Sequence, residues 1–201
     1  MILMLCLVVS VFVGSVSFYD VSTMQSYTIM LDVRLPRVLM AIFLGASLSM
    51  SGAVFQIILK NPMVDSFTLG MANGAVLGSA LTVITVIPVI FAPIMSIICG
   101  LLTMVLVLII ARRLDLSYRP ETLIITGVLL GSLLSGILYL IILVNPEDTQ
   151  NISRYMFGSL SGVNYYQVAV VMVLTFIAFI LLIRYGRQLD LLKLGDIRAH
   201  A

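Results

Sequence analysis

Long uncharged runs separated by short polar segments dominate this sequence. Residues 38–59 carry no charge, and as a helix rising about 1.5 Å per residue they would extend about 33 Å. That length is enough to cross the hydrocarbon core of a bilayer, which is about 30 Å thick. The pattern predicts six membrane-spanning helices, at approximately residues 1–18, 38–59, 68–87, 93–111, 122–144 and 165–183.

Prolines and polar residues mark the ends of these predicted helices. Residues 19–32 are polar and predict a loop, after which Pro36 suits the first turn of a helix, where its missing N–H costs little. The uncharged stretch 68–111 is too long for one span, and Pro88 and Pro93 divide it into two helices. Each boundary thus coincides with residues that disfavour a continuous helix.

Three further stretches have two interpretations each. Residues 1–18 resemble a signal peptide in length but lack a basic n-region and a small-residue cleavage site, so we interpret them as a transmembrane helix and leave the completeness of its start open. Residues 155–163 are too short to span and predict a re-entrant or surface helix. Residues 189–201 alternate leucines with charges, which suits an amphipathic tail or docking into a groove of a partner.

The composition requires lipid as the main solvent of this protein. The chain of 201 residues is 61% hydrophobic and 10% charged, whereas a soluble protein has about 25% charged residues. So few polar side chains cannot cover a surface that faces water. The predicted fold class is therefore an all-α polytopic membrane protein. A net charge of +2 gives no indication of a nucleic-acid partner.

The positive charges are distributed unevenly between the two sides of the six predicted spans. Eight of the eleven Lys and Arg residues fall on one side: Lys60, Arg112, Arg113, Arg119, Arg184, Arg187, Lys193 and Arg198. The positive-inside rule makes that side cytoplasmic, together with the C-terminus of the chain. Arg34, Arg37 and Arg154 are then outside, and Tyr165 and Tyr166 predict an interfacial anchor at the outer end of the last span.

Arg34 and Arg37, which we call the arginine collar, break the positive-inside trend. One interpretation is that both side chains snorkel to lipid headgroups from the end of the second span. The other is that two arginines one turn apart hold a carboxylate of a partner protein outside the membrane. The residues alone leave both interpretations open.

Small residues recur on three of the predicted helices, mostly at four-residue spacing. They are Gly45, Ser49, Gly52 and Ala53 on the second helix, Gly70, Gly74 and Gly78 on the third, and Gly127, Gly131 and Ser135 on the fifth. Such residues let helix backbones approach closely. The alternative is that they line a transport pathway, because small and hydroxyl side chains leave room for a large solute.

Polar groups inside the predicted spans are few, with Gln56 and Asn73 the main ones. No ionisable residue lies at mid-span, which argues against coupling to protons or sodium. His200, Cys6 and Cys99 have no neighbours in sequence that suit a metal site, a disulfide or catalysis. No G-x-x-x-x-G-K-S/T phosphate loop is present, so any use of ATP requires another chain, and no cofactor is predicted.

Three blocks of residues resemble, in order, the FecCD/BtuC-like permease family of iron-siderophore, haem and vitamin B12 ABC importers. The first block is Arg34-Leu35-Pro36-Arg37, Gly45-Ala46, Ser51-Gly52-Ala53, Gln56, Asn61-Pro62 and Leu69-Gly70. The second is Gly127 and Gly131 with Phe157-Gly158-Ser159-Leu160-Ser161-Gly162, and the third is Leu194-Gly195-Asp196. Ser66 departs from the family pattern, which usually has a second proline there.

The resemblance implies a permease with about ten spans, located in a bacterial or archaeal inner membrane. Its expected partners are a second permease subunit (identical or paralogous), two cytoplasmic ATPases and an extracytoplasmic binding protein that delivers a metal chelate. It also implies that Arg34 and Arg37 meet glutamates of the binding protein, that the fifth helix lines the pathway, and that Leu194, Gly195 and Asp196 open the segment coupled to the ATPases. Because the sequence ends at Ala201, within that segment, we expect it to be the N-terminal part of a longer permease.

The sequence therefore predicts a transport subunit without catalytic or metal-binding residues of its own, driven by separate ATPases. Two other functions stay open. A secondary, ion-coupled transporter would need an ionisable group at depth in the membrane. A non-transporting membrane scaffold would need neither the collar nor a pathway.

Overall fold

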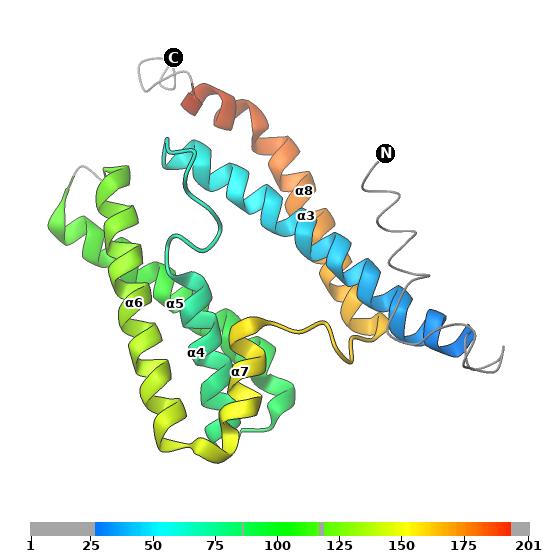
Figure 1. Cartoon of the computed structure of the whole chain (residues 1–201). Coiled ribbons are helices and arrows are strands. Elements are labelled where there is room, and N and C mark those ends of the chain that lie inside the picture. Colours follow the sequence, from blue (N-terminus) through cyan, green and yellow to red (C-terminus); the bar gives the residue numbers. More distant parts are fainter. Residues whose placement is uncertain (1–26, 86, 117–118, 194–201) are drawn as a thin grey trace. The chain divides into compact units, whose positions relative to one another are not determined.

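The structure is a computed structural model that describes residues 27–85, 87–116 and 119–193. Within these ranges every regular element is a helix (Figure 1), which confirms the all-α prediction. The first predicted span, residues 1–18, and the predicted coupling residues Leu194, Gly195 and Asp196 lie outside the described residues.

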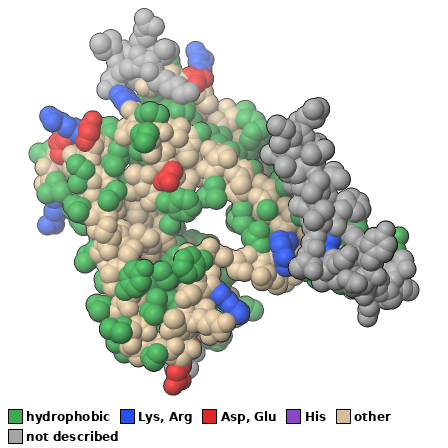
Figure 2. All heavy atoms as spheres, viewed as in Figure 1, with side chains coloured by type: hydrophobic (Ala, Val, Ile, Leu, Met, Phe, Trp, Pro, Cys, Tyr) green, Lys and Arg blue, Asp and Glu red, His purple; other side chains and the backbone are tan. Residues whose placement is uncertain are grey.

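The described helices follow one another along the chain without strands between them. They are η1 (Ile29–Arg34), α3 (Leu35–Ile58), α4 (Met71–Ile84), η2 (Val89–Phe91), α5 (Ala92–Leu114), α6 (Pro120–Val144), η3 (Pro146–Asp148), α7 (Thr149–Phe157) and α8 (Tyr165–Lys193). Four helical segments of the described ranges are long and apolar enough to cross a membrane: Ile29–Ile58, Val89–Leu114, Pro120–Val144 and Tyr165–Leu192. Figure 2 shows hydrophobic side chains over much of the visible surface, as expected for helices that face lipid.

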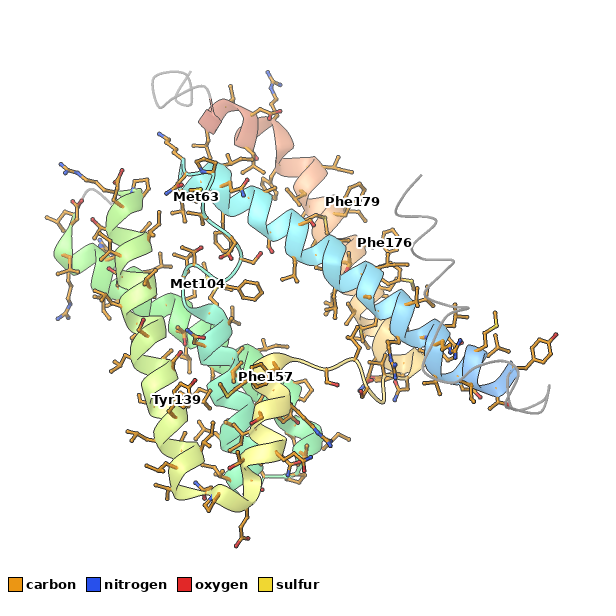
Figure 3. All side chains as sticks on the ribbon, in the orientation of Figure 1. Met63, Met104, Tyr139, Phe157, Phe176 and Phe179 are labelled. Carbon is orange, nitrogen blue, oxygen red and sulfur yellow. The ribbon has the colours of Figure 1, made fainter. Side chains whose placement is uncertain are left out.

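The chain divides into two compact units, of which the first comprises residues 1–51 and 160–201. Its described helices, α8 and most of α3, lie side by side (Figure 1) and run in the same direction. Near mid-length the hydroxyls of Ser47 and Thr175 are 2.8 Å apart. The ring of Phe43 lies with its centroid 6.2 Å from that of Phe176, which is labelled in Figure 3. Within this unit the two helices therefore point toward the same side.

The second unit, residues 52–159, is a close-packed set of helices built around α4. Glycines make this packing possible: a Cβ at Gly78 would lie 2.5 Å from the Met95 carbonyl oxygen of α5. A Cβ at Gly74 would similarly overlap Thr103, so α4 runs antiparallel to α5 in contact along two turns. Small residues on α4 therefore serve helix packing here.

Three predicted boundaries differ from the structure. The 68–87 span is the 14-residue helix α4, only about 21 Å long, because the chain before Gly70 is not helical. Residues 29–32 of the predicted loop are helical and lead directly into α3. The surface helix expected at 155–163 is α7, which ends at Phe157 because Gly158 has a φ of 74°.

The position of α7 follows from its pattern of apolar residues. Ile152 is completely buried and packs with Ala80 and Leu138, and Met156 packs against the same cluster. Most of the other side chains of α7 are polar, which a short helix at a membrane surface requires. A short helix was expected at 155–163, either re-entrant or at the membrane surface. The structure has one short helix in this region, displaced by six residues at each end, and the choice between the two positions stays a prediction.

Candidate functional site

The arginine collar lies within a continuous helix, not at its first turn. Ile29–Arg34 forms a wide turn of the π type, in which the Leu35 N–H donates to the Met30 carbonyl, five residues back. Pro36 explains the wide turn, because a proline ring inside a regular helix collides with the carbonyl four residues earlier and donates no hydrogen bond. Sequence reasoning placed Pro36 at a helix start, where the same missing donor would cost nothing.

The length of this helix sets the depth of the collar. Ile29–Ile58 contains 30 residues and is therefore about 45 Å long, which exceeds a hydrocarbon core of about 30 Å. If Ile58 lies near one edge of the core, the opposite edge lies near residue 38. Arg37 is exposed and Arg34 is half-buried. With Ile58 in that position, both arginines would lie at or beyond the opposite edge.

A second feature is the non-helical segment 59–70 between α3 and α4, which we call the connector. Its backbone N–H groups donate to nearby backbone carbonyls and, at three positions, to side chains of the connector. The Asn61 Oδ1 accepts from the Met63 N–H at 2.9 Å, and the Asp65 Oδ1 accepts from the Phe67 N–H at 2.9 Å. The Thr68 hydroxyl donates to the same Asp65 carboxylate oxygen at 2.7 Å. These bonds give the connector one defined conformation.

The Asp65 carboxylate is exposed, and the Thr68 hydroxyl donates a hydrogen bond to it. The Thr68 hydroxyl lowers the pKa of Asp65 below its ordinary value of 3.8, and the backbone N–H of Phe67 adds to this, although partial burial opposes both. Asp65 is therefore ionised at neutral pH, and its charge has to lie in water or against polar groups of protein.

The connector packs against α6 through glycines on both sides. Gly70 has a φ of 71°, and a Cβ there would lie 2.8 Å from the Gly127 carbonyl oxygen. A Cβ at Gly127 would in turn lie 2.7 Å from the Thr68 carbonyl oxygen and 2.8 Å from the Leu69 Cα. The Asn73 side chain donates to the Gly131 carbonyl at 3.0 Å. No side chain fits between these two backbones.

This contact fixes how far the connector extends along α6. Gly127 and Gly131 lie about 10 and 16 Å from the start of α6 at Pro120. The chain at Leu69 and Gly70 therefore lies alongside the membrane-length helix, not beyond its end. Irregular backbone at such a depth is tolerated only where protein buries it or where it borders water.

One side of the connector is buried and the other is exposed. Leu59, Val64 and Leu69 are at most 4% exposed and pack with Val107 of α5. Met63, labelled in Figure 3, is 88% exposed. The exposed side also carries Asp65.

The predicted small and polar residues separate into two groups. The Gln56 side-chain amide donates to the Val64 carbonyl at 3.2 Å, and a Cβ at Gly52 would lie 3.7 Å from the Ser66 Oγ, so both residues adjoin the connector, as do Gly127 and Gly131. Gly45 and Ser49 are exposed on α3, and Ser135 is half-buried on α6. The sequence reasoning did not assign the connector contacts of Thr68 and Gly70, although the Asp-x-x-Thr spacing is a recognisable turn signal.

The described residues contain no group of three or more His, Cys, Asp or Glu side chains that could hold a metal ion. They likewise contain no buried side-chain nitrogen or oxygen without a hydrogen-bond partner.

The chain is similar to permease proteins of ABC transporters. The permease protein YvrB of Bacillus subtilis (strain 168), an ABC transporter permease, is 36% identical over 176 residues, which cover 85% of this chain and 50% of YvrB. The Fe(3+) dicitrate transport system permease protein FecD of Escherichia coli (strain K12) is 32% identical over 177 residues, which cover 87% of this chain and 54% of FecD. The chain thus spans about half the length of the curated relatives it matches.

A solved structure shares the fold. It belongs to a transporter assigned to the metal-chelate type of ABC transporters, in an inward-facing conformation, and it superposes with a TM-score of 0.83 at 26% identity. The match covers 98% of this chain and 64% of that one. The profile of the FecCD transport family matches residues 2–201. These matches, together with the membrane-length helices, show that the chain is a multi-pass membrane protein that belongs to the FecCD transport family.

Proposed function

We propose that this chain is the N-terminal half of a permease subunit of an ATP-driven importer for a ferric siderophore or a related metal chelate. The observation that carries the proposal is the fold shared along 98% of the chain with a transporter of metal-chelate type. The likeness to a ferric dicitrate permease supports the same class of cargo. The permease works with a second permease subunit, two cytoplasmic ATPases and an extracytoplasmic binding protein.

The arginine collar is the dock for the binding protein. Its position at or beyond the edge of the membrane core and the exposure of Arg37 support this role. Guanidinium groups bind carboxylates through two hydrogen bonds, so acidic residues on the binding protein are the natural counterpart. The distribution of positive charges supports an outer position for the collar and a cytoplasmic position for the C-terminal end of α8.

The connector borders the transport pathway near its cytoplasmic end. One side is anchored to α5 and α6, and the exposed side carries an ionised carboxylate that cannot face lipid. Gly127 and Gly131 allow the connector to pack closely against α6. Gly45 and Ser49, on an exposed stretch of α3, are the better candidates for lining the pathway.

Coupling to the ATPases runs through α8. This helix continues to Lys193, about 15 Å beyond the predicted end of the span at residue 183. It therefore forms a rigid link from the membrane to Leu194, Gly195 and Asp196. Binding of the loaded binding protein and of ATP to different states of the permease then opens the pathway to each side in turn.

Charge reversal of the collar tests this function. The full-length permease with Arg34→Glu and Arg37→Glu, assembled with its ATPases, should lose docking of the binding protein and chelate uptake. Arg154→Glu, at an exposed outer-side arginine of α7, is the matched control and should retain both. Unchanged docking and uptake in the double variant would reject the dock and favour snorkelling or a scaffold role.

A further inference from the structure

The wide turn before Pro36 leaves one backbone carbonyl without an intrahelical donor. The Leu35 N–H donates to the Met30 carbonyl, five residues back. At the same five-residue spacing, the Leu31 carbonyl would accept from the backbone N–H of residue 36. Pro36 has no N–H to donate. The Leu31 carbonyl must therefore find a partner outside its own helix or bind water.

Tyr165, the first residue of α8, supplies that partner. Its hydroxyl donates to the Leu31 carbonyl oxygen at 2.5 Å, across 134 residues of sequence. Both helices belong to the same compact unit, and further contacts at Ser47–Thr175 fix their parallel register. The neighbouring Tyr166 is 77% exposed, and of this tyrosine pair it is Tyr165 whose hydroxyl reaches η1.

We propose that Tyr165 is a positioning residue for the arginine collar: its hydroxyl holds the wide turn that carries Arg34 and thereby sets the affinity with which the binding protein docks. The inference rests on the proposed function of the collar. Arg34 is the last residue of the wide turn and Arg37 directly follows Pro36, so the turn determines how the two guanidinium groups lie relative to one another. A change of one residue in helical register would rotate the segment before Pro36 by about 100°.

The same contact gives α8 two functional ends. Its outer end holds the turn beneath the collar, and its inner end continues to Lys193 and the proposed coupling segment. One helix therefore connects the site where the binding protein docks to the side where the ATPases act. Tyr165 is the residue at which this connection reaches the collar.

Replacing Tyr165 with phenylalanine removes the hydroxyl and keeps the ring. In the full-length permease assembled with its ATPases, Tyr165→Phe should weaken docking of the binding protein by about 2- to 12-fold, the range that one intramolecular hydrogen bond contributes. The maximal rate of ATP hydrolysis at saturating binding protein should not change, because Tyr165 orients the dock and does not act in hydrolysis. Tyr166→Phe is the matched control, with an expected change below about 2-fold.

Repeating the Tyr165→Phe substitution in a Pro36→Ala variant tests whether the effect of the hydroxyl depends on the wide turn. Pro36→Ala restores an N–H at residue 36 and allows a regular helix, in which the Leu31 carbonyl has its own donor. In that background Tyr165→Phe should change docking by less than about 2-fold. An equal loss in both backgrounds, or no loss with Pro36 present, would overturn the inference.

Amide hydrogen exchange of the wide turn, read at Leu35, provides a measurement that needs no partner protein. Exchange should be faster in Tyr165→Phe than in Tyr166→Phe, and equal rates would overturn the inference even if Pro36→Ala did not fold. Charge reversal of Arg34 and Arg37 tests separately whether the collar binds the binding protein at all. If that reversal leaves docking unchanged, the proposed function is wrong whatever the exchange at Leu35 shows.

Discussion

The contact between the connector and α6 can be tested with two glycines of one helix. Gly127→Val would put a branched side chain where even a Cβ lies 2.7 Å from the Thr68 carbonyl oxygen. Gly136→Val, nine residues further along α6, adds the same side chain where no atom lies within 4 Å of the Cβ. The change in helix propensity is the same in both variants, so the difference between them isolates the connector contact.

The atoms that oppose a side chain at Gly127 are backbone atoms of the connector, which cannot move aside as a flexible side chain would. Overpacking of this kind costs about 1–3 kcal/mol. For a protein of 150–250 residues that corresponds to a melting temperature lower by about 2–12 °C, and the shift is smaller in the longer full-length permease. The assay is thermal unfolding of the purified full-length permease in detergent, with both variants measured side by side. Equal melting temperatures for Gly127→Val and Gly136→Val would refute the close approach of connector and α6.

Other parts of the account give further predictions. Asp65→Ala should raise the labelling rate of a cysteine placed at Val64, which is 2% exposed, because the connector loses its bonds to Phe67 and Thr68; an unchanged rate would contradict that role. The pKa of Asp65 is lowered in the folded protein, so the stability from its carboxylate is present above the ordinary value of 3.8 and is lost as pH falls through the lowered value, which a pH series of melting temperatures checks. Ser47→Ala should cost no more than about 1.5 kcal/mol of stability, since the Thr175 hydroxyl retains the Val171 carbonyl at 2.8 Å; a larger loss of thermal stability would contradict this.

The membrane-length helices were predictable because their signal is local. Uncharged runs of about 20 residues placed α3, α5, α6 and most of α8 within a few residues of their observed bounds. In each case a property of consecutive residues determines the element. The outer position of the collar stays a prediction, and its expected place at the first turn of a helix was wrong, because the helix begins before Arg34.

The connector and the wide turn were not predictable because their causes are distant in sequence. The chain near Gly70 is held by Gly127 and Gly131, about 60 residues away, and α4 is short as a consequence. Pro36 correctly indicated that helical hydrogen bonding is interrupted, but the hydrogen bond to the Leu31 carbonyl that compensates for the interruption comes from Tyr165. Sequence spacing showed the small residues of α6 without showing that a non-helical segment packs on them.

The central claim is that ATP drives uptake through this permease. The direct measurement is chelate uptake by proteoliposomes that contain the full-length permease and its ATPases, with binding protein added on the collar side. The account predicts uptake that requires hydrolysable ATP, persists when a protonophore removes the proton gradient, and stops when the ATPase is inactivated. Uptake that continues after ATP is depleted and collapses with the proton gradient would contradict it and identify a secondary transporter.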